Sequence, residues 1–192
     1  RAGRIALALT QKMPRELRNE IQAVISPAMG GLIIGHEMGR ALGVDAMFVE
    51  RPTGTFEFRR GFALKEGEKV LMVEDVVTTG LSSREAMDAI RAAGGVCNHT
   101  SLVFFYDIFP GTRERLAEHG ITLHYLATWH DVLAEAGDYF DAATIAEVRK
   151  FFADPLGWSK TPSVIEELKA VQAHLGEIEE TAKAARHNVK LL

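Results

Sequence analysis

The stretch that most constrains the fold is a buried-strand pattern that runs without a break into two acids and a glycine turn. It covers residues 70–82 and reads VLMVEDVVTTGLS. Apolar and β-branched positions on both sides of the acid pair are typical of a strand covered on both faces, as in a parallel sheet. Residues 82–93 then show helical spacing at Ala86, Ala89 and Ile90, and we expect Ser82 or Ser83 to cap that helix. The run predicts a strand, turn and helix with the acids at the carboxyl end of the strand.

These residue types in this order suit a sugar phosphate. A helix N-terminus offers unpaired N–H groups to a phosphate, and Gly80 lets the backbone approach it closely. Carboxylates at Glu74 and Asp75 can accept hydrogen bonds from vicinal ribose hydroxyls or hold a divalent cation. Hydroxyl side chains add further donors: Thr78, Thr79 and Ser82. The alternative is an ordinary strand-loop-helix unit in which the acids serve only as caps. It is disfavoured, because two adjacent acids at the end of a buried strand cost free energy without a ligand.

The rest of the chain alternates between strand and helix patterns. Further strands are expected at residues 23–26, 46–50, 100–106 and 122–127, and residues 55–62 alternate as an exposed strand or a hairpin arm would. Helices are expected at the N-terminus, from Gly31 to Leu42 with Gly43 as the stop, and at residues 110–119, 131–136 and 142–152. This alternation predicts an α/β fold with a doubly wound, mainly parallel sheet.

A C-terminal helical appendage is expected to follow that domain. We place the domain at residues 1–158 and a helical tail at residues 159–192. From Val164 to Leu192 the apolar positions step alternately by four and three, which is a heptad pattern. Gly176 interrupts it at a cost of about 1 kcal/mol. Two interpretations of this pattern remain open: a helix that pairs between two chains, and a single amphipathic helix that folds onto its own domain.

The run at residues 73–82 resembles the signature of the type I phosphoribosyltransferases, which use phosphoribosyl pyrophosphate. Over about residues 1–127 the chain resembles the orotate phosphoribosyltransferases within that family. A P-loop is excluded because no Gly-Lys-Ser/Thr follows the turn. A dinucleotide-binding turn is excluded because the spacing G-x-G-x-x-G is absent. The resemblance implies an enzyme that makes orotidine 5-monophosphate and pyrophosphate in UMP biosynthesis. The alternatives are another type I purine or pyrimidine phosphoribosyltransferase and a non-catalytic phosphoribosyl pyrophosphate sensor.

The resemblance also assigns roles to residues. It implies catalytic roles for Glu74, Asp75 and Arg51, an orotate contact at Thr78, and Mg²⁺ held by Glu74 and Asp75 through ribose hydroxyls or water. A second anion-binding turn is expected at residues 26–31, because paired glycines before a helix expose N–H groups. The full set expected to bind phosphoribosyl pyrophosphate is Glu74, Asp75, Val76, Val77, Thr78, Thr79, Gly80, Leu81, Ser82, Met29, Gly30, Arg51, Arg59 and Arg60.

The chain departs from the familiar family pattern at several positions. The resemblance implies a flexible loop that closes over the substrates, at the hairpin flanked by Arg51, Arg59 and Arg60. In this chain the loop lacks the Arg-Lys, Lys and His residues of the familiar pattern. Gly30 stands where the pyrophosphate turn usually has lysine. Ile108 follows Asp107 where the family often has an arginine for the orotate carboxylate, so that Arg113 or Arg115 would have to replace it; both are more typical of surface helix charges. The chain does not begin with Met, and we expect the family's N-terminal hood to be incomplete in this sequence.

The composition and net charge of the chain restrict the classes of ligand that we expect it to bind. A net charge of −4 and a pI near 6.0 argue against nucleic acid as the main ligand. No window approaches the roughly 20 apolar residues of a membrane span. The single cysteine, Cys97, is expected to be a buried thiol, which suits the cytoplasm, and the histidines lack zinc-like spacing. We therefore expect a cytoplasmic protein that binds phosphoribosyl pyrophosphate and orotate, does not bind nucleic acid or a membrane, and forms a homodimer as the resemblance implies.

Overall fold

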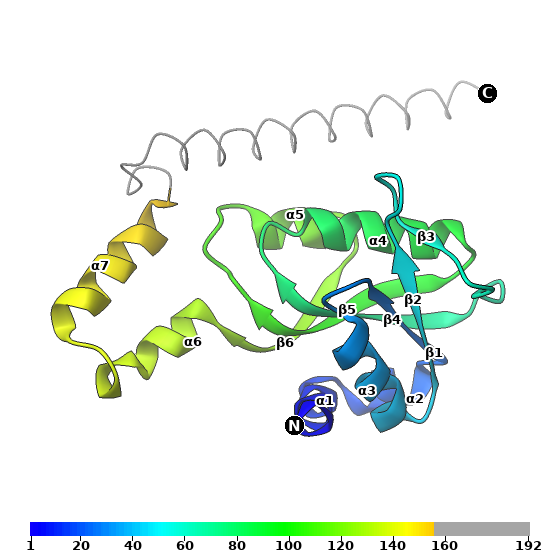
Figure 1. Ribbon diagram of the computed structural model, residues 1–192, viewed down its shortest axis with the longest axis horizontal. Coiled ribbons are helices and arrows are strands. Elements are labelled where there is room, and N and C mark those ends of the chain that lie inside the picture. Colours follow the sequence, from blue (N-terminus) through cyan, green and yellow to red (C-terminus); the bar gives the residue numbers. More distant parts are fainter. Residues whose placement is uncertain (156–192) are drawn as a thin grey trace. The chain divides into compact units, whose positions relative to one another are not determined.

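The computed structural model describes residues 1–155 of the 192-residue chain (Figure 1). The chain divides into two compact units, Arg1–Glu135 and Ala136–Leu192, and each is described by itself. The predicted domain boundary after residue 158 and the heptad pattern that begins at Val164 lie outside the described residues, so both stay predictions.

The first unit is built on one six-stranded sheet with the order β3-β2-β1-β4-β5-β6. The strands are β1 (Ala23–Pro27), β2 (Asp45–Glu50), β3 (Glu57–Phe58), β4 (Lys69–Val77), β5 (Val96–Phe105) and β6 (Thr122–Thr128). Neighbours in the sheet pair in parallel, except that β2 and β3 are antiparallel. The predicted mainly parallel sheet is confirmed, and β4, which carries the acid pair, lies between β1 and β5.

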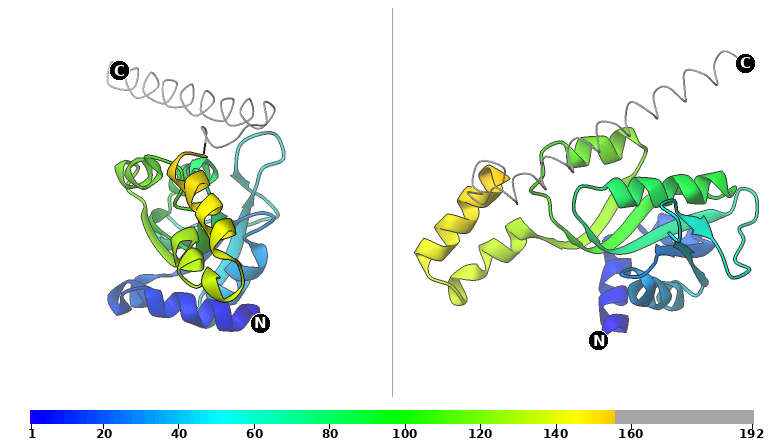
Figure 2. Two further views of the ribbon diagram at one scale, coloured as in Figure 1. Left: turned by 90° about the vertical axis from the view of Figure 1, so that its left-hand side faces the viewer. Right: turned by 45° about the horizontal axis from the view of Figure 1, so that its top comes forward.

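Helices cover both faces of this sheet (Figures 1 and 2). On one face, α1 (Ala2–Lys12) and α3 (Leu32–Leu42) pack Leu9, Ile34 and Met38 against Leu71 and Val73 of β4. On the other face lie α4 (Leu81–Ala92) and α5 (Thr112–Glu118). Their apolar side chains pack with those of the strands in one cluster, which includes Ile25, Val70, Met72, Ala86, Met87, Ile90 and Leu116. Two apolar clusters on opposite faces make the fold doubly wound, as predicted.

Two local details differ from the expectation. Residues 55–62 were expected to form an exposed strand or a hairpin arm, but within them only Glu57–Phe58 form a strand, which pairs with β2 at Val49 and Glu50. The chain leaves the extended conformation on both sides, because Gly54 and Arg60 have positive φ. A short helix, α2 (Arg15–Glu20), was not predicted, because its six residues include one apolar side chain, Leu17, and a single apolar position cannot show helical spacing.

The helix expected at residues 131–136 begins two residues earlier, as α6 (Trp129–Ala134). A capping box explains the start: the Thr128 N–H donates to Asp131 Oδ2 over 2.6 Å, and the Asp131 N–H donates to Thr128 Oγ1 over 3.3 Å. In the second unit, a 3₁₀ turn, η1 (Ala136–Asp138), precedes α7 (Ala142–Ala153). Asp141 caps α7 by accepting the Thr144 N–H over 2.7 Å.

Helix α3 lies unusually close to β1, and a glycine makes this possible. A Cβ placed on Gly35 would lie 2.5 Å from Oγ and 2.6 Å from Cβ of Ser26. Ser26 is itself 2% exposed, so its side chain has no solvent to move into. The approach of α3 sets where the turn after β1 lies, and that turn borders the candidate site.

We expect Gly35→Ala to destabilise the protein by about 1–2 kcal/mol. Overpacking of a filled interior costs about 1–3 kcal/mol, and the better helix propensity of alanine recovers less than about 1 kcal/mol of it. Urea unfolding followed by circular dichroism measures the difference. Gly137→Ala is the control, since no atom lies within 4 Å of a Cβ at Gly137. A Gly35→Ala variant as stable as the wild type would contradict the close packing of α3.

Candidate functional site

A cleft of about 240 Å³ opens at the carboxyl end of β4, where ligands bind in doubly wound sheets. One wall is the turn between β4 and α4 together with the first residues of α4, and Arg51, which follows β2, contributes from another segment. The lining residues are Arg51, Glu74, Val76, Val77, Thr78, Thr79, Gly80, Leu81, Ser82, Ser83 and Glu85. Most of the residues expected from the motif at 73–82 therefore share one cleft.

The turn that ends at α4 is shaped by Gly80. Its φ of 76° is a left-handed conformation, and a Cβ there would lie 2.9 Å from Leu116 Cδ2, so a larger residue is excluded on both grounds. The prediction that Ser82 or Ser83 caps α4 is wrong, because the N-cap is Gly80 and no side chain accepts a capping hydrogen bond. The first N–H groups of α4 consequently face the cleft without a capping side chain, and this suits an anion.

The adjacent acids Glu74 and Asp75 have different environments, because neighbouring strand residues point to opposite faces. Glu74 is 6% exposed, and one of its side-chain oxygens, Oε1, is buried with no hydrogen-bond partner. Burial raises the pKa of Glu74 to about 7; the Ser83 hydrogen bond opposes this shift, and the charge of Asp75 adds to it. A buried carboxyl group with an unpaired oxygen at a cleft is a candidate binding group, because a ligand that donates a hydrogen bond would satisfy that oxygen.

Asp75 is exposed and lies against the turn that follows β1. Its Oδ1 accepts the N–H of Val76 over 2.8 Å, and a Cβ on Gly30 would lie 2.5 Å from its Oδ2. Glycine at position 30 therefore leaves room for this carboxylate. The same turn holds a cis peptide bond between Ala28 and Met29, and Met29 is 79% exposed. The structure thus brings the second predicted anion-binding turn next to the acid pair.

The three predicted arginines all contact acids. Arg51 pairs with Glu85 and lies 4.2 Å over the ring of Phe56. Arg60 makes a two-pronged contact with Glu50, at 2.8 and 3.1 Å, and Arg59 lies 3.8 Å from Glu57. Of these arginines, the cleft lining includes Arg51 and leaves Arg59 and Arg60 outside. Met29, Gly30 and Asp75 also lie outside that lining.

Two cleft residues were missed by the sequence reasoning: Ser83 and Glu85. For Ser83 a signal existed, because residues 83, 86, 87 and 90 form the buried face of α4 at helical spacing. Glu85 is recognisable only as the partner of Arg51, 34 residues away, and no local pattern predicts that pair.

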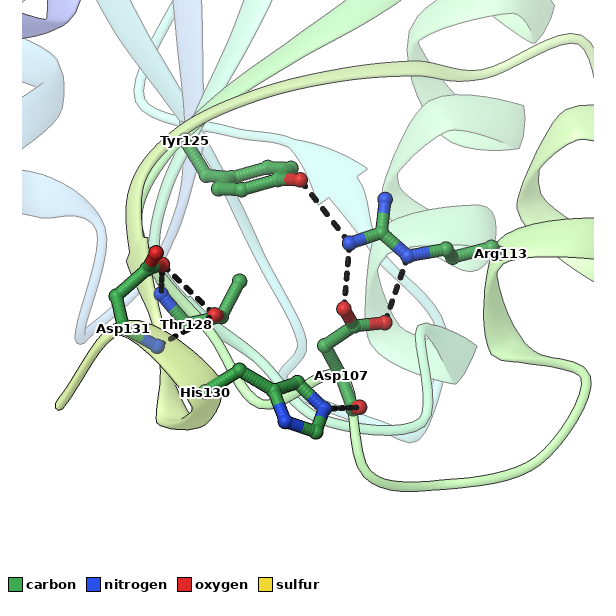
Figure 3. A network of polar contacts seen from close by, with 6 residues as sticks. All are labelled: Asp107, Arg113, Tyr125, Thr128, His130 and Asp131. Carbon is green, nitrogen blue, oxygen red and sulfur yellow. Dashed lines mark hydrogen bonds and ion pairs between the residues drawn. The ribbon is translucent and has the colours of Figure 1, made fainter. Parts of the chain in front are cut away.

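Arg113 is held in a polar network beyond the carboxyl end of β5 (Figure 3). Its guanidinium donates to both oxygens of Asp107 over 2.7 and 2.5 Å, donates to the Tyr125 hydroxyl over 3.0 Å, and lies 4.8 Å over the ring of Phe105. The hydrogen bonds to Asp107 raise the pKa of Arg113. The arginine is thus oriented by three neighbours even though about half of its side chain is exposed.

Among residues 1–155, no group of three or more His, Cys, Asp or Glu side chains is arranged to hold a metal ion. Within the same residues, every helix is too short or too polar to cross a membrane. Cys97 is buried, as predicted, and burial raises the pKa of its thiol to about 11.

Comparison with known proteins gives one consistent family. The profile described as "Phosphoribosyl transferase domain" matches residues 2–107. Proteins named orotate phosphoribosyltransferase from Novosphingobium aromaticivorans and Erythrobacter litoralis are 78% identical over 95 residues and 71% identical over 104 residues. These matches cover 50% and 54% of this chain, and 49% and 54% of the two relatives. The chain therefore spans about half the length of the curated relatives it matches.

Solved structures give the same fold. The orotate phosphoribosyltransferase from Aeropyrum pernix superposes with a TM-score of 0.56 at 25% identity, covering 69% of this chain and 74% of that chain. An adenine phosphoribosyltransferase superposes with a TM-score of 0.54 at 20% identity, covering 63% of this chain and 77% of that chain, and this likeness shows the fold alone.

The raised pKa of Glu74 predicts a pH-dependent stability. Between its ordinary value of 4.5 and its folded value of about 7, the folded protein binds this proton and the unfolded chain does not. The free energy of unfolding should therefore fall as pH rises through this window, by up to about 3 kcal/mol from this residue. Urea unfolding at pH 5 and pH 8 measures the loss, and Glu74→Gln should reduce it.

Glu118→Gln is the matched control, because Glu118 is an exposed glutamate on α5. It should keep the wild-type difference between the two pH values. An equal loss of stability in Glu74→Gln and in the wild type would contradict the burial of an ionisable carboxyl at position 74.

Proposed function

The chain belongs to the phosphoribosyl transferase domain family, and on that premise we propose that it acts as an orotate phosphoribosyltransferase. It transfers ribose 5-phosphate from phosphoribosyl pyrophosphate to orotate, which yields orotidine 5-monophosphate and pyrophosphate for UMP biosynthesis. The observation that carries this proposal is the cleft at the end of β4, where the uncapped N-terminus of α4 and the buried Glu74 lie together. The identity to proteins named orotate phosphoribosyltransferase supports the choice of base.

Phosphoribosyl pyrophosphate would be held by hydrogen-bond donors at its phosphates and by carboxylates at its ribose. The 5-phosphate would lie on the N–H groups at the start of α4, with the hydroxyls of Thr78, Thr79 and Ser82 as further donors. The ribose hydroxyls would donate to Glu74 and Asp75. Glu74 Oε1 has no hydrogen-bond partner, so a ribose hydroxyl there would satisfy an otherwise unpaired buried oxygen. The turn with Met29 and Gly30 would bind the pyrophosphate end.

The reaction breaks the bond from the anomeric carbon to the pyrophosphate oxygen and forms a bond from that carbon to a ring nitrogen of orotate. Its transition state resembles an oxocarbenium ion, so that catalysis is mainly positional and electrostatic. Glu74 and Asp75 would orient the ribose, and Arg51, with Arg59 and Arg60, would neutralise the leaving group. These arginines would first have to leave Glu85, Glu57 and Glu50, and such exposed pairs contribute only about 0–1 kcal/mol each.

Mg²⁺ fits this donor set. The ion prefers oxygen ligands and is commonly held by one or two carboxylates together with substrate phosphates. The unpaired Oε1 of Glu74 and the exposed carboxylate of Asp75 are such oxygens, reached through ribose hydroxyls or water. Bound Mg²⁺ would neutralise charge on the pyrophosphate. Among residues 1–155 no three or more His, Cys, Asp or Glu side chains are grouped to hold the ion, so substrate oxygens and water would supply the remaining ligands.

The base would contact Thr78, which lines the cleft. Position 108 is isoleucine, so this chain has no arginine directly after Asp107 to meet the orotate carboxylate. The second candidate, another type I phosphoribosyltransferase, rests on that difference. We further propose that the protein is a cytoplasmic homodimer that binds neither nucleic acid nor a membrane, in keeping with its net charge of −4.

Turnover tests the proposal directly. The purified protein, with Mg²⁺ and phosphoribosyl pyrophosphate, should consume orotate and release pyrophosphate, measured by orotate absorbance and a coupled pyrophosphate assay. Adenine, xanthine and uracil are assayed in parallel. Turnover of one of these in place of orotate would support the second candidate, and binding of phosphoribosyl pyrophosphate without turnover of any base would make the protein a sensor.

Asp75→Asn should lower kcat/KM by at least about a hundredfold, because a group that orients the reacting sugar is lost. The thermal unfolding midpoint should change little, since Asp75 is exposed. Asp45→Asn is the control, because Asp45 is an exposed aspartate at the start of β2, the opposite end of the strand from the cleft. Normal steady-state kinetics in Asp75→Asn would refute the role of this carboxylate.

A further inference from the structure

The arginine at position 113 is oriented by neighbours from other segments of the fold (Figure 3). Its Nε donates to Asp107 Oδ1 over 2.7 Å, and its Nη2 donates both to Asp107 Oδ2 over 2.5 Å and to the Tyr125 hydroxyl over 3.0 Å. The guanidinium also lies 4.8 Å over the ring of Phe105. A planar group held at one edge and on one face has little freedom to turn, so Arg113 is not the freely moving surface charge expected from its position on α5.

The group that anchors this arginine is itself fixed. Asp107 has a φ of 51°, a left-handed conformation that aspartate adopts more readily than most residues. Its backbone oxygen accepts a hydrogen bond from Nε2 of His130 over 3.2 Å, and Figure 3 shows this contact on the side of Asp107 away from Arg113. Both the main chain and the side chain of Asp107 are therefore held, which gives the guanidinium a defined place.

One nitrogen of the guanidinium remains available to a ligand. Asp107 contacts the edge formed by Nε and Nη2, so Nη1 of Arg113 is the nitrogen farthest from that carboxylate. Within residues 1–155, Nη1 makes no hydrogen bond. Its two N–H groups can donate to an anion, and hydrogen bonds from arginine to a carboxylate are among the stronger ones in proteins. Because the side chain is already ordered, binding would cost little further conformational entropy.

Two contacts place Arg113 near the cleft at the end of β4. The segment that follows β5 is joined to the cleft wall, because the Tyr106 N–H donates to the backbone oxygen of Val77 over 2.9 Å and Val77 lines the cleft. Helix α5 reaches the same wall one turn after Arg113, where a Cβ on Gly80 would lie 2.9 Å from Leu116 Cδ2. Both elements that hold the arginine therefore border the turn of the proposed phosphoribose site.

We propose that Arg113 is a specificity-determining residue that binds the carboxylate of the acceptor base through Nη1, and that Asp107 and Tyr125 position it for this contact. The inference rests on the proposed function, which supplies orotate, a pyrimidine that carries a carboxylate. In that function the phosphates of the donor bind at the start of α4 and at the turn with Met29 and Gly30. The carboxylate of the base is the remaining anion, and the base has to lie beside the ribose in order to react.

Steady-state kinetics with orotate and phosphoribosyl pyrophosphate test this assignment. Arg113→Gln should raise the KM for orotate by about ten- to hundredfold, because charge-assisted hydrogen bonds to the carboxylate are lost. The KM for phosphoribosyl pyrophosphate should not change. Tyr125→Phe removes one of the groups that hold Nη2 and keeps the ring, so it should raise the KM for orotate by about two- to tenfold.

Arg115→Gln is the matched control. Arg115 lies on the same helix but donates within its own turn, to the Pro110 oxygen over 3.1 Å and to Thr112 Oγ1 over 3.1 Å. Both KM values should stay as in the wild type. If Arg113→Gln does not fold because Asp107 loses its partner, Arg113→Lys takes its place. Lysine keeps a positive charge beside Asp107 but has a single nitrogen, so it cannot hold Asp107 and the ligand in the same geometry, and the KM for orotate should rise here too.

Three outcomes count against the proposals, and they can be told apart. An unchanged KM for orotate in the Arg113 variant, in an enzyme that turns over orotate, would overturn the inference and leave the proposed function standing. Equal rises in the two KM values would also overturn it, because they would indicate a change in the fold near the cleft and not a lost contact with the base. A wild type without orotate turnover would refute the proposed function, and the inference that depends on it would fail as well.

Discussion

Burial of β4 on both faces of the sheet is the constraint on which the site depends. Val70 and Met72 pack against α4 and α5, and Leu71 and Val73 pack against α1 and α3. A strand held from both sides cannot change register without moving its side chains to the wrong face. The fixed register of β4 therefore fixes the positions of the residues that follow Val73, including the turn and the start of α4.

This rigidity gives the adjacent acids different chemistry. Glu74 stays in the protein interior, where burial raises its pKa to about 7, and Asp75 reaches solvent beside Gly30. A free oxygen on a buried carboxyl costs stability, and proteins keep such groups mainly where a ligand satisfies them. Strand β4 therefore has two roles. Its apolar residues pack in the core, and its carboxyl end supplies the two carboxylates of the proposed phosphoribosyl pyrophosphate site, each with different surroundings.

Sequence reasoning succeeded where the signal is local and failed where the partner is distant. Strands such as β4 and helices such as α3 follow from periodicity and from stop residues such as Gly43. The capping prediction failed because α4 begins earlier than expected, directly after Gly80, so that Ser82 and Ser83 lie inside the helix and Ser83 is on its buried face. Another pair that spacing did not reveal is His99 and His124, whose ring nitrogens lie 3.2 Å apart because β5 and β6 are neighbours in the sheet.

By itself, the sequence determined the class of fold, the strand that carries the acids and the turn that presents α4, because these depend on contacts within a few residues. Only the tertiary structure decided that Glu74 is buried, that Asp75 lies beside Gly30, and that Arg51, Arg59 and Arg60 pair with acids. The physical reason is that burial and pairing depend on the whole surroundings of a side chain. Elements distant along the chain supply much of those surroundings, and the fold brings them together.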